Sequence, residues 1–235
     1  MKPQRVIPKR EGASSSSKHS APRLKNFDWQ RLPELFQRLD KTYSDAGCAL
    51  QHRNAYELLV ATILSAQCTD TRVNQVTPGL FRWFPTPKAL SRARQDRVER
   101  LIRSTGFFRN KAKNLIGMAN MLMRDYAGEV PSEMAELTRL PGVARKTANV
   151  VLGVIWNIAA GIVVDTHVQR IARLLGLTRH TDPSTIEQDL MRAVPQDRWV
   201  SFGHQIIHHG RRICIARRPR CAECVLSDLC PSSKV

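Results

Sequence analysis

Four cysteines crowd one short segment near the C-terminal end of this 235-residue sequence. They follow the spacing C-x6-C-x2-C-x5-C and lie at Cys214, Cys221, Cys224 and Cys230. Four thiolates from one loop can hold a metal centre, either a tetrahedral zinc ion or an iron–sulfur cluster. Zinc sites of this type usually contain two CxxC pairs, and the single CxxC here weakens the zinc interpretation. Crowded cysteines in a chain of this size favour a metal over disulfides, so we expect a reducing compartment.

A second candidate for chemistry is a lysine in the run LPGVARKTA, residues 140–148. Pro141 and Gly142 predict a turn that enters a helix, and the free backbone N–H groups at such a helix start can bind a phosphate. Lys146 would lie in the first turn of this helix. The neighbouring Arg145 and the positive end of the helix dipole disfavour an ammonium ion there, so we expect a lowered pKa and a nucleophilic amine. A solvated surface lysine is the plain alternative.

An aspartate, Asp165, lies in the short motif VDTH at residues 164–167. Its position directly before an apolar helical pattern predicts a helix N-cap, and capping alone is an adequate structural explanation for it. The most apolar run of the sequence, residues 150–164, precedes it. That run has 15 residues, short of the roughly 20 that a membrane span needs, so it predicts a buried helix followed by a turn.

The composition indicates a polyanionic partner. Lys and Arg number 37 against 20 Asp and Glu, and the formal net charge of +17 is far more than solubility requires. Nucleic acid is the leading candidate, with an anionic membrane surface as the alternative. Arginines also interleave with the cysteines, at Arg211, Arg212, Arg217, Arg218 and Arg220. They can contact phosphates, offset the negative charge of a thiolate-ligated cluster, or do both.

Residues 1–27 contain seven Lys or Arg, one acidic residue and a serine run at 14–17, with almost nothing apolar to bury. This composition predicts a disordered basic arm. A solvated tail without function and an organelle transit peptide are the alternatives. No apolar stretch of the kind found in secretion signals follows the N-terminus, so export is not indicated.

The rest of the chain predicts a nearly all-α fold. From Asp28 onward apolar residues recur at helical spacing and no stretch keeps a period of two, so about ten helices would fit. Residues placed as helix caps or stops are Asn54, Thr86, Asp182 and Gly128. Pro78 interrupts the helical stretch 71–84, and we expect that helix to be kinked there or shortened.

Three of these motifs resemble those of the endonuclease III family of DNA glycosylases: the cysteine spacing, VDTH and the run 140–148. This run is similar to the family's helix-hairpin-helix element, LPGxGxxTA, except that Ala144 replaces the second glycine. Its methyl group should weaken or shift a phosphate contact at most. The resemblance implies an all-α helix-hairpin-helix DNA glycosylase fold. A six-helix barrel domain would span residues 47–157, an iron–sulfur cluster domain would combine 28–46 with 158–235, and DNA would bind in the cleft between them.

The resemblance also implies site residues. Lys146 would attack C1′ of the damaged nucleotide, Asp165 would stabilise the cationic transition state and assist proton transfers, and the four cysteines would hold a [4Fe-4S] cluster. The residues implied to bind DNA are Gln67, Phe107, Gly142, Ala144, Arg145, Thr147 and His167. Gln67 would fill the space of the extruded nucleotide, and Phe107 would act as a wedge unless it is plain core.

The activity that the resemblance implies is that of a bifunctional DNA glycosylase and AP lyase of base excision repair. It would remove oxidised pyrimidines such as thymine glycol from duplex DNA and nick the abasic site by β-elimination. The enzyme would be a monomer without a membrane partner, associated with the nucleoid in a bacterial cytoplasm, while organelle targeting by the basic arm stays open. The alternatives are a thymine- or adenine-specific mismatch glycosylase, a non-catalytic iron–sulfur DNA-binding protein and a redox-responsive regulator.

Overall fold

The structure is a computed structural model that describes residues 27–235. The predicted arm, residues 1–27, therefore lies outside the described residues apart from its last position. Phe27 is only 3% exposed, and its backbone N–H donates to the carbonyl of Gly176 at 3.4 Å. The predicted arm therefore ends one residue too late, because the aromatic side chain of Phe27, its last residue, is packed against the protein.

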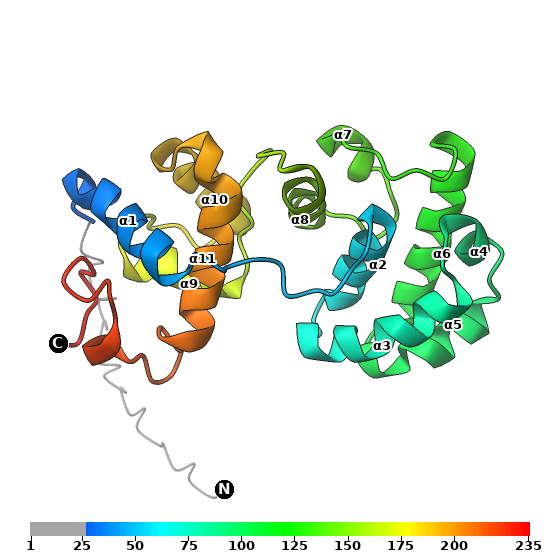
Figure 1. Ribbon diagram of the computed structural model, residues 1–235, viewed down its shortest axis with the longest axis horizontal. Coiled ribbons are helices and arrows are strands. Elements are labelled where there is room, and N and C mark those ends of the chain that lie inside the picture. Colours follow the sequence, from blue (N-terminus) through cyan, green and yellow to red (C-terminus); the bar gives the residue numbers. More distant parts are fainter. Residues whose placement is uncertain (1–26) are drawn as a thin grey trace, which may run out of the picture.

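Residues 27–235 fold into eleven α-helices and four short 3-10 helices without a strand, which confirms the all-α prediction (Figure 1). The α-helices are α1 (Leu32–Thr42), α2 (Ala55–Ser65), α3 (Asp70–Trp83), α4 (Pro87–Ser91), α5 (Gln95–Ile102), α6 (Phe108–Asp125), α7 (Met134–Leu137), α8 (Arg145–Trp156), α9 (Thr166–Leu174), α10 (Pro183–Ala193) and α11 (Trp199–Arg212). The side chains of Asn54, Thr86 and Asp182 cap α2, α4 and α10 as expected. α3 continues through Pro78, so that helix is not shortened.

The buried apolar side chains form two separate cores. The first lies among α2 to α8 and contains Leu58, Leu115 and Leu152, each at most 1% exposed. The second lies among α1, α9, α10, α11 and the segment after α11, and contains Ile186 and Phe202. Figure 1 shows the two helix groups side by side, with α8 between them. The chain passes from the second group to the first through residues 43–54 and returns after α8.

α2 is the central helix of the first core. Its nine consecutive residues 56–64 are all buried, and a helix buried on every side must lie inside a ring of other helices. α2 ends at Ser65, and the chain reaches the surface at once, at the exposed residues Ala66 and Gln67. The packing of α2 therefore fixes the point from which Gln67 projects.

Polar bridges join the two helix groups at two places. Arg211 of α11 pairs with Asp70 of α3, with 2.6 Å between the guanidinium and the carboxylate. Glu187 of α10 accepts hydrogen bonds from two residues of α8, Arg145 at 2.9 Å and Asn149 at 2.8 Å. These bridges connect elements that are far apart in the sequence.

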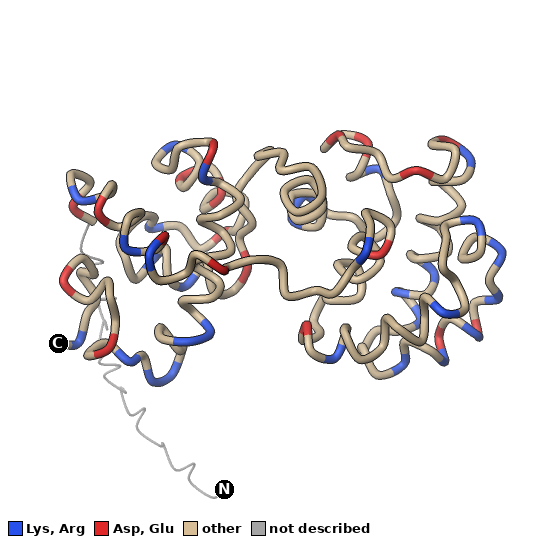
Figure 2. The backbone as a smooth tube through the Cα atoms, in the orientation of Figure 1, with Lys and Arg blue, Asp and Glu red and all other residues tan. Residues whose placement is uncertain are grey.

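Lys and Arg are spread over both helix groups, and several of them follow one edge of the molecule together with a few acidic residues. Figure 2 shows Lys and Arg segments along the lower edge of both helix groups, including the segment after α11 and parts of α3 and α5. A basic edge of this kind suits a polyanion that spans both groups. None of the helices formed by residues 27–235 has the length and apolar character needed to cross a membrane.

Candidate active site and iron–sulfur loop

The run 140–148 forms the turn that enters α8 and the first turn of that helix. Gly142 has φ +80°, a left-handed conformation that suits glycine, and a Cβ atom there would lie 3.0 Å from the side chain of Asn114. Leu140 and Val143, at 2% and 6% exposure, anchor the turn in the first core. The turn is thereby held against the protein, and its backbone faces outward at the exposed Gly142 and Ala144.

The start of α8 has no side-chain cap. Ala144 is its N-cap residue, and the first-turn N–H groups therefore have no side-chain acceptor, unlike those of α2 and α3, which Asn54 and Thr69 cap. Ala144 has φ −88° and ψ 168°, an extended conformation that any L-residue adopts. Alanine in place of the second hairpin glycine thus causes no backbone strain, and the N–H groups stay open to an anion.

Lys146 is exposed in the first turn of α8, and it has no hydrogen-bond or ion-pair partner among residues 27–235. Its neighbour Arg145 is engaged, because the Nε of Arg145 donates to the carboxylate of Glu187 at 2.9 Å. The positive charge that was expected to act on Lys146 is therefore paired with a carboxylate that is far away in the sequence. Thr147 is half-buried on the same turn.

Asp165 is the N-cap of α9, as the sequence predicts. Its Oδ1 accepts hydrogen bonds from the backbone N–H groups of His167 and Val168, both at 2.8 Å. Its Oδ2 accepts none from the described residues, and the side chain is only half-buried. Asp165 can therefore cap the helix with one oxygen and present the other to a ligand.

His167 is turned toward the protein. Its Nδ1 is buried without a hydrogen-bond partner among the described residues, and a Cβ atom on Gly210 of α11 would lie 2.8 Å from it. Burial lowers the pKa of His167. This packing between α9 and α11 gives His167 a structural role, and its contact with DNA stays a prediction.

Gln67 and Phe107 are the two residues expected to enter the DNA duplex. Both are exposed, and Phe107 is 64% exposed, so the alternative that Phe107 is plain core is wrong. Both adopt the left-handed conformation, with φ 53° for Gln67 and φ 46° for Phe107. Non-glycine residues rarely adopt it, and such strain concentrates at functional sites. Phe108, by contrast, is half-buried against the first core.

The four cysteines line one cavity of about 170 Å³ at the end of α11, together with apolar side chains such as Ile171 and Leu226. All four are free thiols, and burial raises the pKa of Cys214, Cys224 and Cys230. Within the described residues, no three Cys, His, Asp or Glu side chains are placed to share a single metal ion. A cavity lined by four sulfurs and mainly apolar surface fits a cluster that takes a thiolate at each of four irons.

A hydrogen-bonded chain reaches this cavity from α1. The hydroxyl of Tyr43 lies 2.8 Å from Nδ1 of the buried His209, and Nε2 of His209 lies 3.7 Å from the sulfur of Cys224. A thiolate that ligates the cluster could only accept, so in the loaded protein Nε2 would carry the proton and Tyr43 would donate to Nδ1. Arg170 holds the other side of the loop by donating to the carbonyl oxygens of Cys214 and Gly210.

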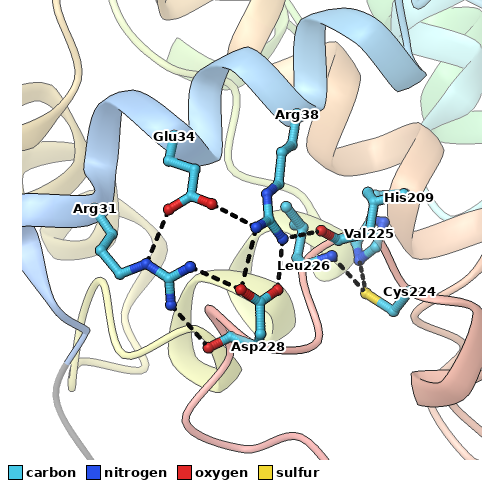
Figure 3. Close-up of polar contacts among 8 residues, drawn as sticks. All are labelled: Arg31, Glu34, Arg38, His209, Cys224, Val225, Leu226 and Asp228. Carbon is cyan, nitrogen blue, oxygen red and sulfur yellow. Dashed lines mark hydrogen bonds and ion pairs between the residues drawn. The ribbon is translucent and has the colours of Figure 1, made fainter.

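Side chains of α1 and of Arg31, just before it, also bind the cysteine loop, residues 214–230, on its outer side (Figure 3). Arg31 and Arg38 both bind the carboxylate of Asp228, which lies between the last two cysteines. The carboxylate of Glu34 forms ion pairs with the same two guanidiniums. Arg38 also donates to the carbonyl of Val225 at 2.7 Å. The side chains of Arg38 and Arg31 hold the pKa of Asp228 well below its usual range.

Two family models match this chain. The model of the HhH-GPD superfamily of base excision DNA repair proteins covers residues 60–196, more than half of the chain. The model of the iron–sulfur binding domain of endonuclease III covers residues 214–230, from Cys214 to Cys230. An endonuclease III of Synechocystis is 54% identical over 205 residues, 87% of this chain and 94% of that protein. The chain belongs to the endonuclease III family.

Other members of the family are similar over almost the same length. An endonuclease III of Bacillus subtilis is 45% identical and aligns over 86% of this chain and 92% of its own. A non-covalent endonuclease III–DNA complex and a trapped covalent endonuclease III–DNA intermediate are each 42% identical with a TM-score of 0.82, and the matches cover 87% of this chain and 95% and 96% of theirs. A thermostable thymine-DNA glycosylase shares the fold at 20% identity and a TM-score of 0.77.

Membership of the endonuclease III family makes this chain a base excision repair enzyme, a DNA glycosylase and AP lyase whose partner is DNA and whose cofactor is a [4Fe-4S] cluster. The mismatch-specific and non-catalytic alternatives are not favoured.

Sequence reasoning missed Glu187, His209 and Asp228. Only Asp228 carried a signal, as the one acidic residue between the last two cysteines, whereas the other two matter through contacts that the sequence does not reveal.

Proposed function

We propose that this member of the endonuclease III family removes oxidised pyrimidines such as thymine glycol from duplex DNA, with Lys146 as nucleophile and Asp165 as its carboxylate partner. The observation that carries the proposal is the exposed amine of Lys146, free of any partner among residues 27–235, at the uncapped start of α8. A phosphate bound at that helix start would bring the sugar of the same strand to the amine.

The proposed reaction begins when the neutral amine of Lys146 attacks C1′ and the C1′–N bond breaks. The base leaves with the bonding electrons and takes up a proton, and the sugar ring opens to an imine between C1′ and Nζ. Positive charge develops on the sugar in the transition state, and the free Oδ2 of Asp165 is suited to stabilise it. The imine acidifies C2′, loss of its proton expels the 3′ phosphate, and hydrolysis returns the amine.

Gln67 and Phe107 would open the duplex. Their exposure and left-handed backbone support this role, because both project from the surface at the ends of packed elements. The amide of Gln67 can hydrogen-bond the base that loses its partner, and the ring of Phe107 can stack in the gap. Gly142, Ala144 and Thr147 would contribute the hairpin that binds the strand, while Arg145 would act through Glu187.

The four cysteines would ligate the cluster, which would have a structural role because four protein thiolates leave no open coordination position. The two cores support a barrel domain over residues 47–157 and a cluster domain from 28–46 and 158–235. We extend the proposal to a monomer in a bacterial cytoplasm, associated with the nucleoid, since the relatives named above are bacterial.

The decisive experiment is a panel of duplexes, each with one defined lesion, incubated with the holoenzyme and scored for base release and for strand cleavage. Thymine glycol should be released and the strand nicked, whereas G·T and A·8-oxoguanine mismatches should stay intact. Preferential release of a mismatched, undamaged base would contradict the substrate proposal. Binding without cleavage of an abasic duplex would contradict the activity.

Asp165→Asn separates the two roles of that residue. Asparagine caps a helix about as well as aspartate, so a residue that only caps α9 should tolerate the change. We expect normal thermal stability and cluster absorbance with a loss of base release on the order of 10²-fold, as for removal of one electrostatic contact to a transition state. Undiminished release would reduce Asp165 to a cap.

A further inference from the structure

Lys111 is a buried lysine in the first turn of α6. It is 5% exposed, and its Nζ donates two hydrogen bonds of 2.8 Å, one to the carbonyl of Leu64 and one to the carbonyl of Thr105. Both acceptors are backbone oxygens. No carboxylate among the described residues pairs with this ammonium, although buried lysines are rare unless paired.

The two acceptors, Leu64 and Thr105, are forty-one positions apart, and each lies at the end of a helical segment. Leu64 lies in the last turn of α2, whose carbonyls lack helical partners, and Gln67 follows three positions later. Thr105 ends the 3-10 helix Arg103–Thr105, and Phe107 follows two positions later. Gln67 and Phe107, the exposed left-handed residues that are proposed to enter the duplex, thus each lie within three positions of a carbonyl that is bonded to Lys111.

The electrostatics of the site favour a cation that bridges the two segments. The carbonyl end of α2 carries the negative end of its helix dipole, which attracts an ammonium, and the second carbonyl adds to this attraction. Burial lowers the pKa of Lys111, and two of the three N–H donors of its ammonium are bonded to these carbonyls. Lys111 is buried and held by both carbonyls, so its Nζ is not placed to attack a sugar.

We propose that Lys111 is a positioning residue that fixes the spacing between Gln67 and Phe107, so that both side chains enter one base-pair step together. This inference rests on the proposed function, in which those two residues open the duplex. Because one side chain bonds the carbonyls of Leu64 and Thr105, the two segments that carry Gln67 and Phe107 move as one unit. Without it, each loop would depend on its own strained backbone to keep its side chain in place.

The test compares wild type with Lys111→Met, whose side chain reaches as far as Cε but lacks Nζ and so removes both hydrogen bonds. Lys111→Gln is the second variant, since its amide can still donate to one carbonyl. Lys113→Met is the matched control, an exposed lysine two residues further along α6. Thermal unfolding and the visible absorbance of the cluster confirm that each protein is folded.

Two substrates separate insertion from chemistry. The first is a paired duplex with thymine glycol, which must be opened; the second is an abasic site facing a one-nucleotide gap, where there is no base pair to open. Lys111→Met should slow single-turnover cleavage of the first by on the order of 10²-fold, the effect of a small misplacement of positioning groups. Borohydride trapping on the second should stay within about threefold of wild type, and Lys113→Met should match wild type on both.

A double-mutant cycle gives the sharper readout. If Lys111 acts through the two insertion residues, adding Lys111→Met to the Gln67→Ala, Phe107→Ala protein should cause less than about threefold further loss. A 2-aminopurine base opposite a stable abasic analogue reports insertion without chemistry, and Lys111→Met should reduce its fluorescence change on binding.

Equal losses on both substrates, multiplicative losses in the cycle, or full activity of Lys111→Met and Lys111→Gln would each overturn the inference. Wild-type protein that cleaves neither substrate would instead refute the proposed function. The two failures are therefore distinguishable.

Discussion

Arg145 of α8 is paired with Glu187 of α10 at 2.9 Å, so the residue next to the proposed nucleophile is tied to the other helix group. Glu187 also accepts from Asn149 at 2.8 Å and is buried at 7% exposure. One carboxylate therefore holds the first turns of α8 against α10 and compensates the charge beside Lys146. The hairpin and the second core are positioned relative to each other through this contact.

Glu187→Gln should weaken this junction while keeping a side chain of the same shape. The amide can still bond Asn149, but the charge-assisted contact to the half-exposed Arg145 is lost, and we expect a loss of about 1–2 kcal/mol in the free energy of unfolding. The freed guanidinium should also raise the affinity for undamaged DNA and steepen its salt dependence. Denaturant unfolding and a salt series measure both effects. Glu99→Gln is the control, because Glu99 is a half-buried residue of α5 whose carboxylate accepts a hydrogen bond from Gln95 of the same helix.

Gly161→Ala should disturb the same junction sterically. A Cβ atom at Gly161 would lie 2.0 Å from Oε1 of Glu187 and 2.8 Å from Nδ2 of Asn149, so the carboxylate must move. We expect a loss of about 3 kcal/mol, at the upper end for overpacking. Gly79→Ala is the matched control, because its Cβ would meet nothing within 4 Å and alanine favours the helix by up to about 1 kcal/mol. Equal melting temperatures for the two variants would contradict the placement of Glu187.

Asp228→Asn should loosen the iron–sulfur loop. The carboxylate of Asp228 binds Arg38 of α1 and Arg31, which directly precedes α1, and a neutral amide cannot satisfy both guanidiniums (Figure 3). Iron should be lost to a chelator several-fold faster than from wild type, as followed by visible absorbance and iron content. Glu223→Gln is the control, since Glu223 lies in the same loop but pairs only with Arg220. Identical rates for both variants would show that the α1 clamp does not retain the cluster.

His204 should make stability depend on pH. It lines a small cavity with Asn149, Gly153 and Gly161, and its pKa is lowered by burial and by the nearby His208 and Arg211. Because the folded pKa lies below the unfolded value of about 6.5, this histidine stabilises the fold fully above that pH. The contribution is lost as the pH falls below about 6.5, where the unfolded chain binds the proton first. The free energy of unfolding measured from about pH 8 to pH 5 should fall less for His204→Gln than for wild type.

Local signals in the sequence were sufficient for the helices and their caps. Asn54 and Asp182 precede apolar helical patterns and do cap α2 and α10, and Gly128, with φ +90°, ends the turn after α6. The capping of α9 by Asp165 follows from the same rule. Each of these features depends on residues within one helical turn of each other, so it can be read from a short stretch of sequence.

Contacts between distant segments were not predictable. Arg145 meets Glu187 forty-two positions later, and Lys111 reaches Leu64 forty-seven positions earlier. Lysine is typically exposed, so nothing in the sequence around Lys111 indicates that it is buried. The left-handed conformation of Phe107 is equally hidden, because its residue type argues against it. Tertiary packing determines the Arg145–Glu187 contact, the burial of Lys111 and the backbone conformation of Phe107.

The covalent role of Lys146 is the central claim, and reductive trapping tests it most directly. Holoenzyme incubated with an abasic duplex and borohydride should form a stable protein–DNA adduct, and peptide mapping should place the adduct on Lys146. Lys146→Gln should bind the duplex with its cluster absorbance intact and form no adduct. Undiminished trapping by Lys146→Gln, or an adduct mapped to another amine, would contradict the account.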